Sequence, residues 1–474
     1  MSVKSQVSND LELLAEEAVA LALRGGATDA EAVGMEGDEF SVRVRLGQVE
    51  ELTESGSRAL GLRVFFEAEG GQRTASVSTS DLSRDGLESI VHAAVELAKV
   101  TGVDSFAGLP EREAFGICET DLALYFDDVD AVPPAERIEM ARRCEAAAMS
   151  YDTRIQNSAG AGFDASSSRR VMVNSRGFSG GYRRSYCSFA VTPIAQDTNG
   201  SMQRDSWYSN ARTPRLLESP EEVGRIAAQR ALRRLGARRV PTQQCPVVFS
   251  PDVSRGLMGN LLNAADGDAI YRNASMFAGK LGEQVAGENI TMVDDGTLVF
   301  ERTVPATGEL LRVGGFGTAP FDGDGLQTRR TVVIERGVLK ELMLNTYTAR
   351  KLGMQSTGKA SRGLAGAPGI GGGCYYLEPG TMSAESLLAE VKNGLYVTST
   401  MGFGTNLVTG DYSQGCSGFW IENGELAYAV EEITIAGNMK EMFRNVSAIA
   451  NDLHFRGAGA VPTVRIEGMT VAGS

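Results

Sequence analysis

The chain has 474 residues, of which 42% are hydrophobic and 22% charged, the balance of a folded globular protein rather than of a disordered chain. Acidic residues outnumber basic ones 60 to 46, and the net charge of −14 argues against direct nucleic-acid binding, because that binding needs cations to displace counterions from phosphates. Single cores rarely grow beyond about 250–300 residues, so the length predicts two domains.

The cysteines and the apolar runs indicate the compartment. Six cysteines lie far apart in the sequence without any C-x-x-C pair, as expected for free thiols of a reducing compartment. Residues 1–9 are polar, unlike a signal peptide, and no run approaches the ~18 apolar residues that span a bilayer. We therefore expect a soluble, cytoplasmic protein with no membrane partner.

The first half mixes helical and strand patterns. In chain order, these patterns predict a helix over 11–23, strands over 40–44, 61–66 and 74–78, a helix over 87–98, a helix over 134–147, and a meander of strands over 154–200. The clearest helix start is Ser219, an N-cap serine followed by a proline and, three residues on, by Glu222. That helix should end near Gly236, and the polar stretch after it marks a domain boundary. We expect an N-terminal α+β domain over 1–238.

The second half, 239–474, has a different pattern. It contains one helical stretch over 253–265 and then mostly short apolar runs typical of strands, separated by glycine turns. Asn423-Gly424 is a strong signal for a two-residue β-hairpin turn. Because helices and strands are clustered rather than strictly alternating, the predicted fold class is α+β, with a mostly β C-terminal domain.

Only two histidines are available for chemistry, so a Ser-His-Asp triad, a Cys-His dyad or a histidine zinc site must use His92 or His454. His92 falls on the polar side of its predicted helix, with Glu88 and Glu96 four residues away on either side. This pattern indicates a solvated helix face rather than a metal site. His454 has no cysteine or second histidine nearby in the sequence, which is typical of a surface or capping residue.

Two glycine-rich stretches, 369–373 and 402–404, match neither a P-loop nor a dinucleotide-binding motif. We expect turns there, or places where another backbone comes close. In the functional alternative, a peptide lies against the uncovered main chain. The candidate peptide contacts are then Gly371, Gly372, Gly373 and Cys374.

Two aspartate pairs also adjoin glycines, Asp294-Asp295 before Gly296 and Asp322 with Asp324 around Gly323. Asp-Gly is ordinary turn chemistry, so we interpret all four carboxylates as turn residues rather than as calcium ligands or catalytic groups.

The second half also contains several specific motifs, namely Val293-Asp294-Asp295-Gly296-Thr297, Val408-Thr409-Gly410-Asp411-Tyr412-Ser413, Gly418-Phe419-Trp420-Ile421 and Val430-Glu431-Glu432-Ile433-Thr434-Ile435. In these stretches the chain resembles the TldD/TldE (PmbA) family, once named modulators of DNA gyrase and now regarded as peptidases. The last two motifs are similar to the TldE (PmbA) branch. The first half matches the family in its order of elements and more loosely in its residues.

The resemblance implies an incomplete zinc site. The catalytic branch of the family carries H-E-x-x-x-H, with two zinc-binding imidazoles and a glutamate base, and a cysteine near the C-terminus as third ligand. Counting back from Val293 places Met258 and Asn263 at the histidine positions and Gly259 at the glutamate, and no cysteine follows Asp452. A thioether and an amide are poor zinc ligands, and glycine cannot accept a proton. We therefore expect neither a metal nor catalytic residues in this chain.

The function implied by the resemblance is that of a zinc-less subunit in a cytoplasmic metallopeptidase complex. In that complex the two subunits would enclose a chamber. A zinc-bearing TldD-type paralogue would cut small unfolded or leader peptides there, and this chain would form part of the chamber wall. One alternative is a stand-alone, homodimeric peptide-binding scaffold without catalysis. Another is an independent hydrolase with an unrecognised nucleophile such as Cys374 or Ser413.

Overall fold

The computed structural model describes residues 10–402 and 404–473. The polar segment 1–9, on which the expectation about a signal peptide rests, lies outside the described residues, as does Phe403 of the second glycine-rich stretch.

One long antiparallel sheet dominates the N-terminal half, with strand order β3-β2-β1-β4-β5-β6 and β7 paired to β5. Its strands are β1 (Asp29–Arg45), β2 (Gln48–Ala68), β3 (Gly71–Thr79), β4 (Ile155–Asn174), β5 (Ser179–Gln196), β6 (Met202–Arg204) and β7 (Trp207–Ala211). The four longest have 17, 21, 20 and 18 residues. At about 3.3 Å per residue they extend over roughly 55–70 Å, which is long enough to carry two separate groups of helices.

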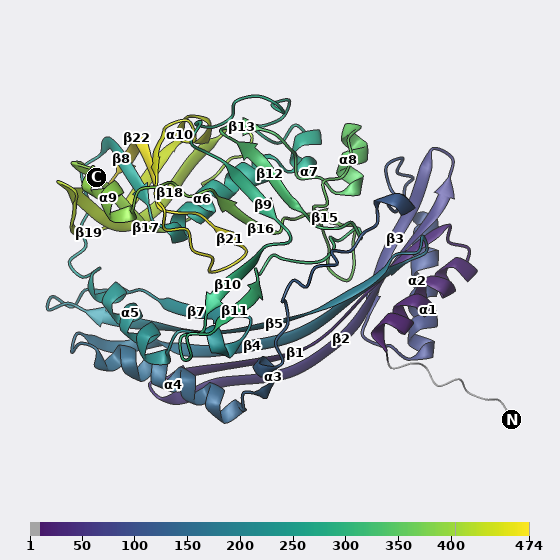
Figure 1. Cartoon of the computed structure of the whole chain (residues 1–474), viewed down its shortest axis with the longest axis horizontal. Coiled ribbons are helices and arrows are strands. Elements are labelled where there is room, and N and C mark those ends of the chain that lie inside the picture. The colour runs from purple at the N-terminus through teal and green to yellow at the C-terminus, as the bar shows by residue number, and fades with distance from the viewer. Residues whose placement is uncertain (1–9, 403, 474) are drawn as a thin grey trace.

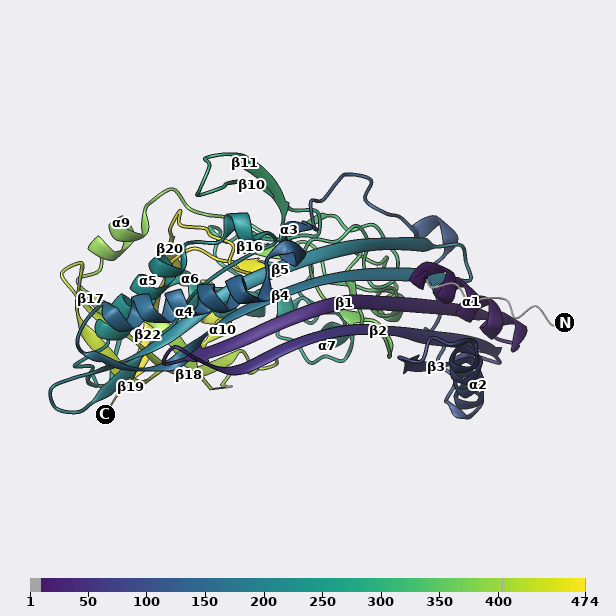
Figure 2. The ribbon, with the colours of Figure 1, turned by 90° about the horizontal axis from the view of Figure 1, so that it is seen from below.

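Helices cover the two ends of this sheet on the face turned away from the C-terminal half (Figures 1 and 2). They are α1 (Leu11–Arg24), α2 (Arg84–Val100), α3 (Asp128–Ala131), α4 (Pro134–Ser150) and α5 (Pro220–Leu232), with 3-10 turns at Arg112–Ala114 and Pro214–Leu216. α1 and α2 form one core with the sheet, and α3, α4 and α5 form a second. Alternate residues of β1 point into both cores, for example Ala32 and Val42.

The C-terminal half contains two larger sheets, ordered β13-β12-β9-β16-β21 and β19-β18-β17-β8-β22-β20, with an additional pairing of β19 to β22. The five-stranded sheet comprises β9 (Met292–Asp295), β12 (Arg330–Glu335), β13 (Val338–Leu339), β16 (Cys374–Leu377) and β21 (Gly459–Ala460). The six-stranded sheet comprises β8 (Gln243–Phe249), β17 (Asn393–Met401), β18 (Asp411–Glu422), β19 (Glu425–Asn438), β20 (Val446–Ile449) and β22 (Val464–Ala472). Two small ribbons complete the strands, β10 (Val299–Thr303) with β11 (Leu310–Gly314), and β14 (Ala360–Ser361) with β15 (Gly369–Ile370).

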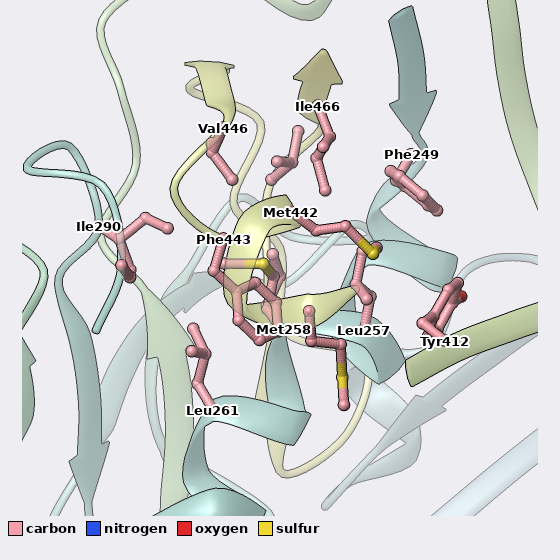
Figure 3. Close-up of a cluster of buried hydrophobic side chains, with 14 of the residues drawn as sticks. Phe249, Leu257, Met258, Leu261, Ile290, Tyr412, Met442, Phe443, Val446 and Ile466 are labelled. Carbon is pink, nitrogen blue, oxygen red and sulfur yellow. The ribbon is translucent and has the colours of Figure 1, made fainter. Parts of the chain in front are cut away.

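The helices of this half are α6 (Pro251–Ala264), α7 (Gly267–Tyr271), α8 (Thr346–Leu352), α9 (Ala384–Ala389) and α10 (Met439–Met442). The main C-terminal core surrounds α6, whose Leu257, Met258 and Leu261 are buried against residues such as Met442 and Phe443 (Figure 3). The inward packing of this helix face fits the predicted helical period.

The predicted fold class, α+β, is confirmed, and so are most of the predicted elements. Ser219 caps α5 by accepting a hydrogen bond from the Glu222 N–H at 3.2 Å. Asn423 and Gly424 both have positive φ, 51° and 84°, as the predicted hairpin turn requires. α5 itself ends at Leu232, and the chain continues through turns to Gly236. Across the described residues, no helix is long and apolar enough to cross a membrane.

The prediction that Asp294 is a turn residue is wrong. It lies within β9 and is completely buried, where it forms an ion pair with Lys359, a residue that is itself 2% exposed. Asp295 does stabilise a turn as predicted, because its Oδ1 accepts a hydrogen bond from the Thr297 N–H at 2.8 Å. Asp322 Oδ1 likewise accepts from the Asp324 N–H at 2.9 Å.

Candidate functional site

The three positions predicted to replace a zinc motif lie on α6 but face different surroundings. Met258 is fully buried and its thioether points into the core (Figure 3). Gly259 is half-buried and Asn263 is exposed. Residues five apart on a helix point about 140° apart around its axis, so Met258 faces the packed core and Asn263 faces solvent.

An aromatic ring lies beside Gly259. A β-carbon at Gly259 would lie 3.3 Å from the Tyr375 hydroxyl, and one at Gly459 would lie 2.2 Å from a carbon of the same ring. Gly459 is therefore needed for Tyr375, on β16, to fit against β21, while Gly259 gives the hydroxyl room beside α6. Burial raises the pKa of Tyr375, and Arg255 opposes that shift, so the phenol is neutral at physiological pH.

The two histidines are both exposed, as predicted, but differ in their surroundings. His92 lies on the solvated face of α2. His454 lines a pocket of about 210 Å³ together with Arg302 and Arg456. Loss of hydration and these two cations lower the pKa of His454 to about 4, so its imidazole is neutral. This pocket could not be predicted from local motifs, because β10, β7 and the 454–457 segment that line it are far apart in the chain.

The glycines before β16 are surrounded by close contacts, with side chains at Gly371 and Gly372 and with another backbone at Gly373. A β-carbon at Gly372 would lie 2.2 Å from Asp294 Oδ1, and one at Gly373 would lie 2.5 Å from the Gly296 Cα. One at Gly371 would lie 2.6 Å from the Ser361 Cβ. The expectation that another backbone comes close is confirmed at Gly373, whereas Gly371 and Gly372 face side chains. These contacts explain the glycines without a bound peptide.

Cys374 follows directly and is completely buried. Its sulfur accepts from the Gly317 N–H at 3.3 Å, and burial raises its pKa. A buried thiol that stays protonated is a poor nucleophile, which counts against the hydrolase alternative based on Cys374. Ser413, the other nucleophile considered, is exposed on β18.

The same glycines line a pocket of about 300 Å³ between the C-terminal loops and strands β4 and β5. Asp322 also lines it and accepts from the N–H groups of Leu326 and Ala360, each at 2.9 Å. Burial, together with the nearby Asp324 carboxyl, raises the pKa of Asp322 to about 7. The pocket thus brings three of the four predicted peptide contacts, Gly371, Gly372 and Gly373, together with Asp322, while Cys374 does not line it.

Known protein families and relatives match this chain over most of its length. Family models match three stretches: PmbA/TldA metallopeptidase domain 1 over 30–98, its central domain over 127–235 and its C-terminal domain over 242–473. Metalloprotease PmbA of Escherichia coli is 37% identical over 476 residues, covering 100% of this chain and 99% of the relative. The chain belongs to the PmbA/TldD family. The resemblance found in the sequence motifs is confirmed.

Solved structures of the PmbA/TldD type share this fold. A protein from Bacteroides thetaiotaomicron named a modulator of DNA gyrase has a TM-score of 0.88 at 25% identity, covering 99% of this chain and 100% of the other. TldE from Thermococcus kodakarensis has a TM-score of 0.81 at 20% identity, covering 97% and 100%. At that identity the second match establishes the fold alone.

A PmbA/TldD metallopeptidase implies a metal, and the residues at the motif positions on α6 do not fit one. Zinc prefers thiolate, imidazole and carboxylate ligands. Met258 offers a thioether turned into the core, Gly259 offers no side chain, and the neutral phenol of Tyr375 lies beside it. Within the described parts of the chain, no group of three or more His, Cys, Asp or Glu residues is arranged to hold a metal ion.

Proposed function

We propose that this chain is the zinc-less, TldE/PmbA-type subunit of a cytoplasmic metallopeptidase complex that degrades or processes small unfolded or leader peptides. A zinc-bearing, TldD-type partner supplies the metal and the base. The observation that carries this proposal is the packing around α6. A buried thioether, a glycine and an exposed amide occupy the positions where the motif of the family's catalytic branch requires two imidazoles and a carboxylate, and a neutral phenol lies beside the glycine.

The role left to this chain is structural support and peptide binding. The pocket beside Gly371–Gly373 lies between the long sheet and the C-terminal half, which suits a chamber wall that contacts extended peptide. The cytoplasmic assignment is supported by the six cysteines, all of which are free thiols, five of them buried.

Zinc content and activity test the proposal together. The purified chain is expected to contain far less than one zinc per molecule and to leave unfolded peptides intact. Addition of a paralogue that carries H-E-x-x-x-H should give about one zinc per pair and chelator-sensitive hydrolysis. Zinc is measured by elemental analysis of the separated species, and hydrolysis by mass spectrometry of the peptide products.

The matched control is the same paralogue with both motif histidines replaced by alanine, which should form the pair without activity. Stoichiometric zinc in the isolated chain, or peptide hydrolysis by it that resists chelators, would overturn the proposal. Recovery from native cells of only self-associated copies of this chain would instead favour the homodimeric scaffold.

A further inference from the structure

The pocket beside Gly371–Gly373 has a cationic wall that peptide-backbone contacts alone do not explain. Four cations line it, and we call it the arginine pocket: Arg170 from β4, Arg184 from β5, and Lys359 and Arg362 from the loop that includes β14. It lies between the two halves of the molecule, so no single stretch of sequence reveals it.

Arg362 is the most constrained of these cations. Its side chain is 1% exposed, and its Nη1 lies 2.6 Å from Glu31 Oε1. Its Nε and Nη2 atoms have no hydrogen-bond partner among the residues that the structure describes, and neither has the buried Nε of Arg184. Buried guanidinium N–H groups almost always find acceptors, so these donors point to a ligand that supplies them.

Two of the four cations in the pocket lack a carboxylate partner in the described part of the chain. Glu31 is shared by Arg362 and Arg63, with the latter at 3.3 Å, and Lys359 is neutralised by Asp294. Within residues 10–402 and 404–473, neither Arg170 nor Arg184 forms an ion pair with a carboxylate; they donate to the main-chain oxygens of Arg362 at 3.0 Å and Thr318 at 3.1 Å. Burial and the neighbouring guanidinium groups lower the pKa of Arg170. A bound anion would relieve this repulsion.

We propose that the arginine pocket binds a carboxylate, and that its occupant is the C-terminal carboxylate of an extended peptide whose last residues lie along Gly371–Gly373. The planar guanidinium groups match the fork of a carboxylate, which accepts two parallel N–H bonds. The Asp322 carboxyl on the same wall, when ionised, repels a doubly charged phosphate more than a singly charged carboxylate. A volume of about 300 Å³ suits the end of a peptide rather than a long stretch.

This inference rests on the proposed peptide-binding function, yet it is tested without zinc or a partner. The isolated full chain is titrated with a fluorescently labelled unfolded hexapeptide, either as the free acid or as its C-terminal amide. Fluorescence anisotropy should give a Kd about 10- to 100-fold lower for the free acid, the usual effect of a hydrogen-bonded charge pair. Arg184→Gln should remove most of this preference.

The matched control is Arg183→Gln. Arg183 is the adjacent residue on β5, but it is exposed and stacks on the Tyr125 ring at 3.6 Å, outside the pocket. This variant should keep the preference, and both variants should keep the wild-type melting temperature to show that they fold.

The proposal as a whole is overturned by an absence of saturable binding of the free acid, by equal binding of acid and amide, or by equal loss in both variants. An amidated peptide with an added internal aspartate that binds as tightly as the free acid would refute the C-terminal assignment. Displacement by inorganic phosphate at lower concentrations than by acetate would refute the preference for carboxylate. None of these outcomes changes the zinc and activity test, so the two proposals fail independently.

Discussion

Replacing Lys359 with methionine is expected to lower the free energy of unfolding by about 3–5 kcal/mol at pH 8. The Lys359 ammonium is 2% exposed and is ion-paired with Asp294, which is completely buried on β9. Methionine keeps most of the aliphatic volume but leaves a carboxylate in the interior without its counter-ion. Chemical unfolding followed by circular dichroism measures the change.

The loss should shrink as the pH falls. Burial raises the pKa of Asp294 in the wild type, and the ammonium opposes that rise, so removing the ammonium raises the pKa further. An acid whose folded-state pKa lies above its unfolded value destabilises the fold only where the unfolded chain has lost the proton. The penalty is therefore absent below about pH 4 and grows as the pH rises through the folded-state pKa. Unfolding at pH 5 should show a clearly smaller difference between variant and wild type.

Two controls separate charge from packing. The double variant Asp294→Asn with Lys359→Met removes both charges and should recover most of the loss. Arg336→Met breaks an ion pair with Glu288 whose side chains are 78% and 82% exposed, and should change stability by less than about 0.5 kcal/mol. A Lys359→Met protein as stable as the wild type at pH 8 would show that the buried pair contributes nothing to folding.

Local sequence signals predicted local structure well. The N-cap at Ser219, the Asn423-Gly424 hairpin and the inward face of α6 each depend on residues within one turn of helix or one hairpin, where spacing and side-chain chemistry decide the conformation. The close backbone approach at Gly373 was also predictable, because only glycine tolerates such a contact.

Long-range pairing was not predictable in the same way. The 154–200 meander indicated strands, but nothing in it showed that β4 would pair with β1, more than 100 residues earlier in the chain, and so create one sheet with two helical cores. Asp294 and Lys359 are 65 residues apart, and Asp294 stands before Asp295-Gly296, so its neighbours suggested a turn. A charge that is buried only by tertiary packing leaves no periodic trace in the sequence.

The arginine pocket could not be predicted from the sequence for the same reason. Sequence motifs identified the family and predicted which positions replace its zinc motif, because both kinds of motif lie within continuous stretches. The four cations come from β4, β5 and a C-terminal loop, and each appears in the sequence as an ordinary charged residue. Only the packing of the C-terminal half onto the long sheet brings them together.

That packing depends strongly on Arg212, and Arg212→Met is expected to lower the free energy of unfolding by about 4 kcal/mol or more. The buried guanidinium donates to the carbonyl oxygens of Gly314 at 2.7 Å, Gly315 at 2.6 Å, Leu124 at 3.2 Å and Ser185 at 3.3 Å. Burial and the nearby Arg184 lower its pKa to about 10, so it remains charged at neutral pH. Methionine would leave four carbonyls without this donor, at about 1–3 kcal/mol for each one that stays buried and unpaired.

Because these carbonyls belong to β5, to the end of β11 and to the segment before α3, the substitution should loosen the contact between the two halves before it unfolds either one. Hydrogen exchange at 310–315 and 122–126 should accelerate together, while exchange in the α1–α2 core stays slow. Arg212→Lys should lie between wild type and methionine, because an ammonium keeps the charge but cannot reach all four acceptors. The control is Arg204→Met, at an exposed residue on β6 of the same sheet, which should leave the free energy of unfolding unchanged. If Arg212→Met has the same melting temperature as Arg204→Met and exchanges at the wild-type rate, the guanidinium does not hold the two halves together.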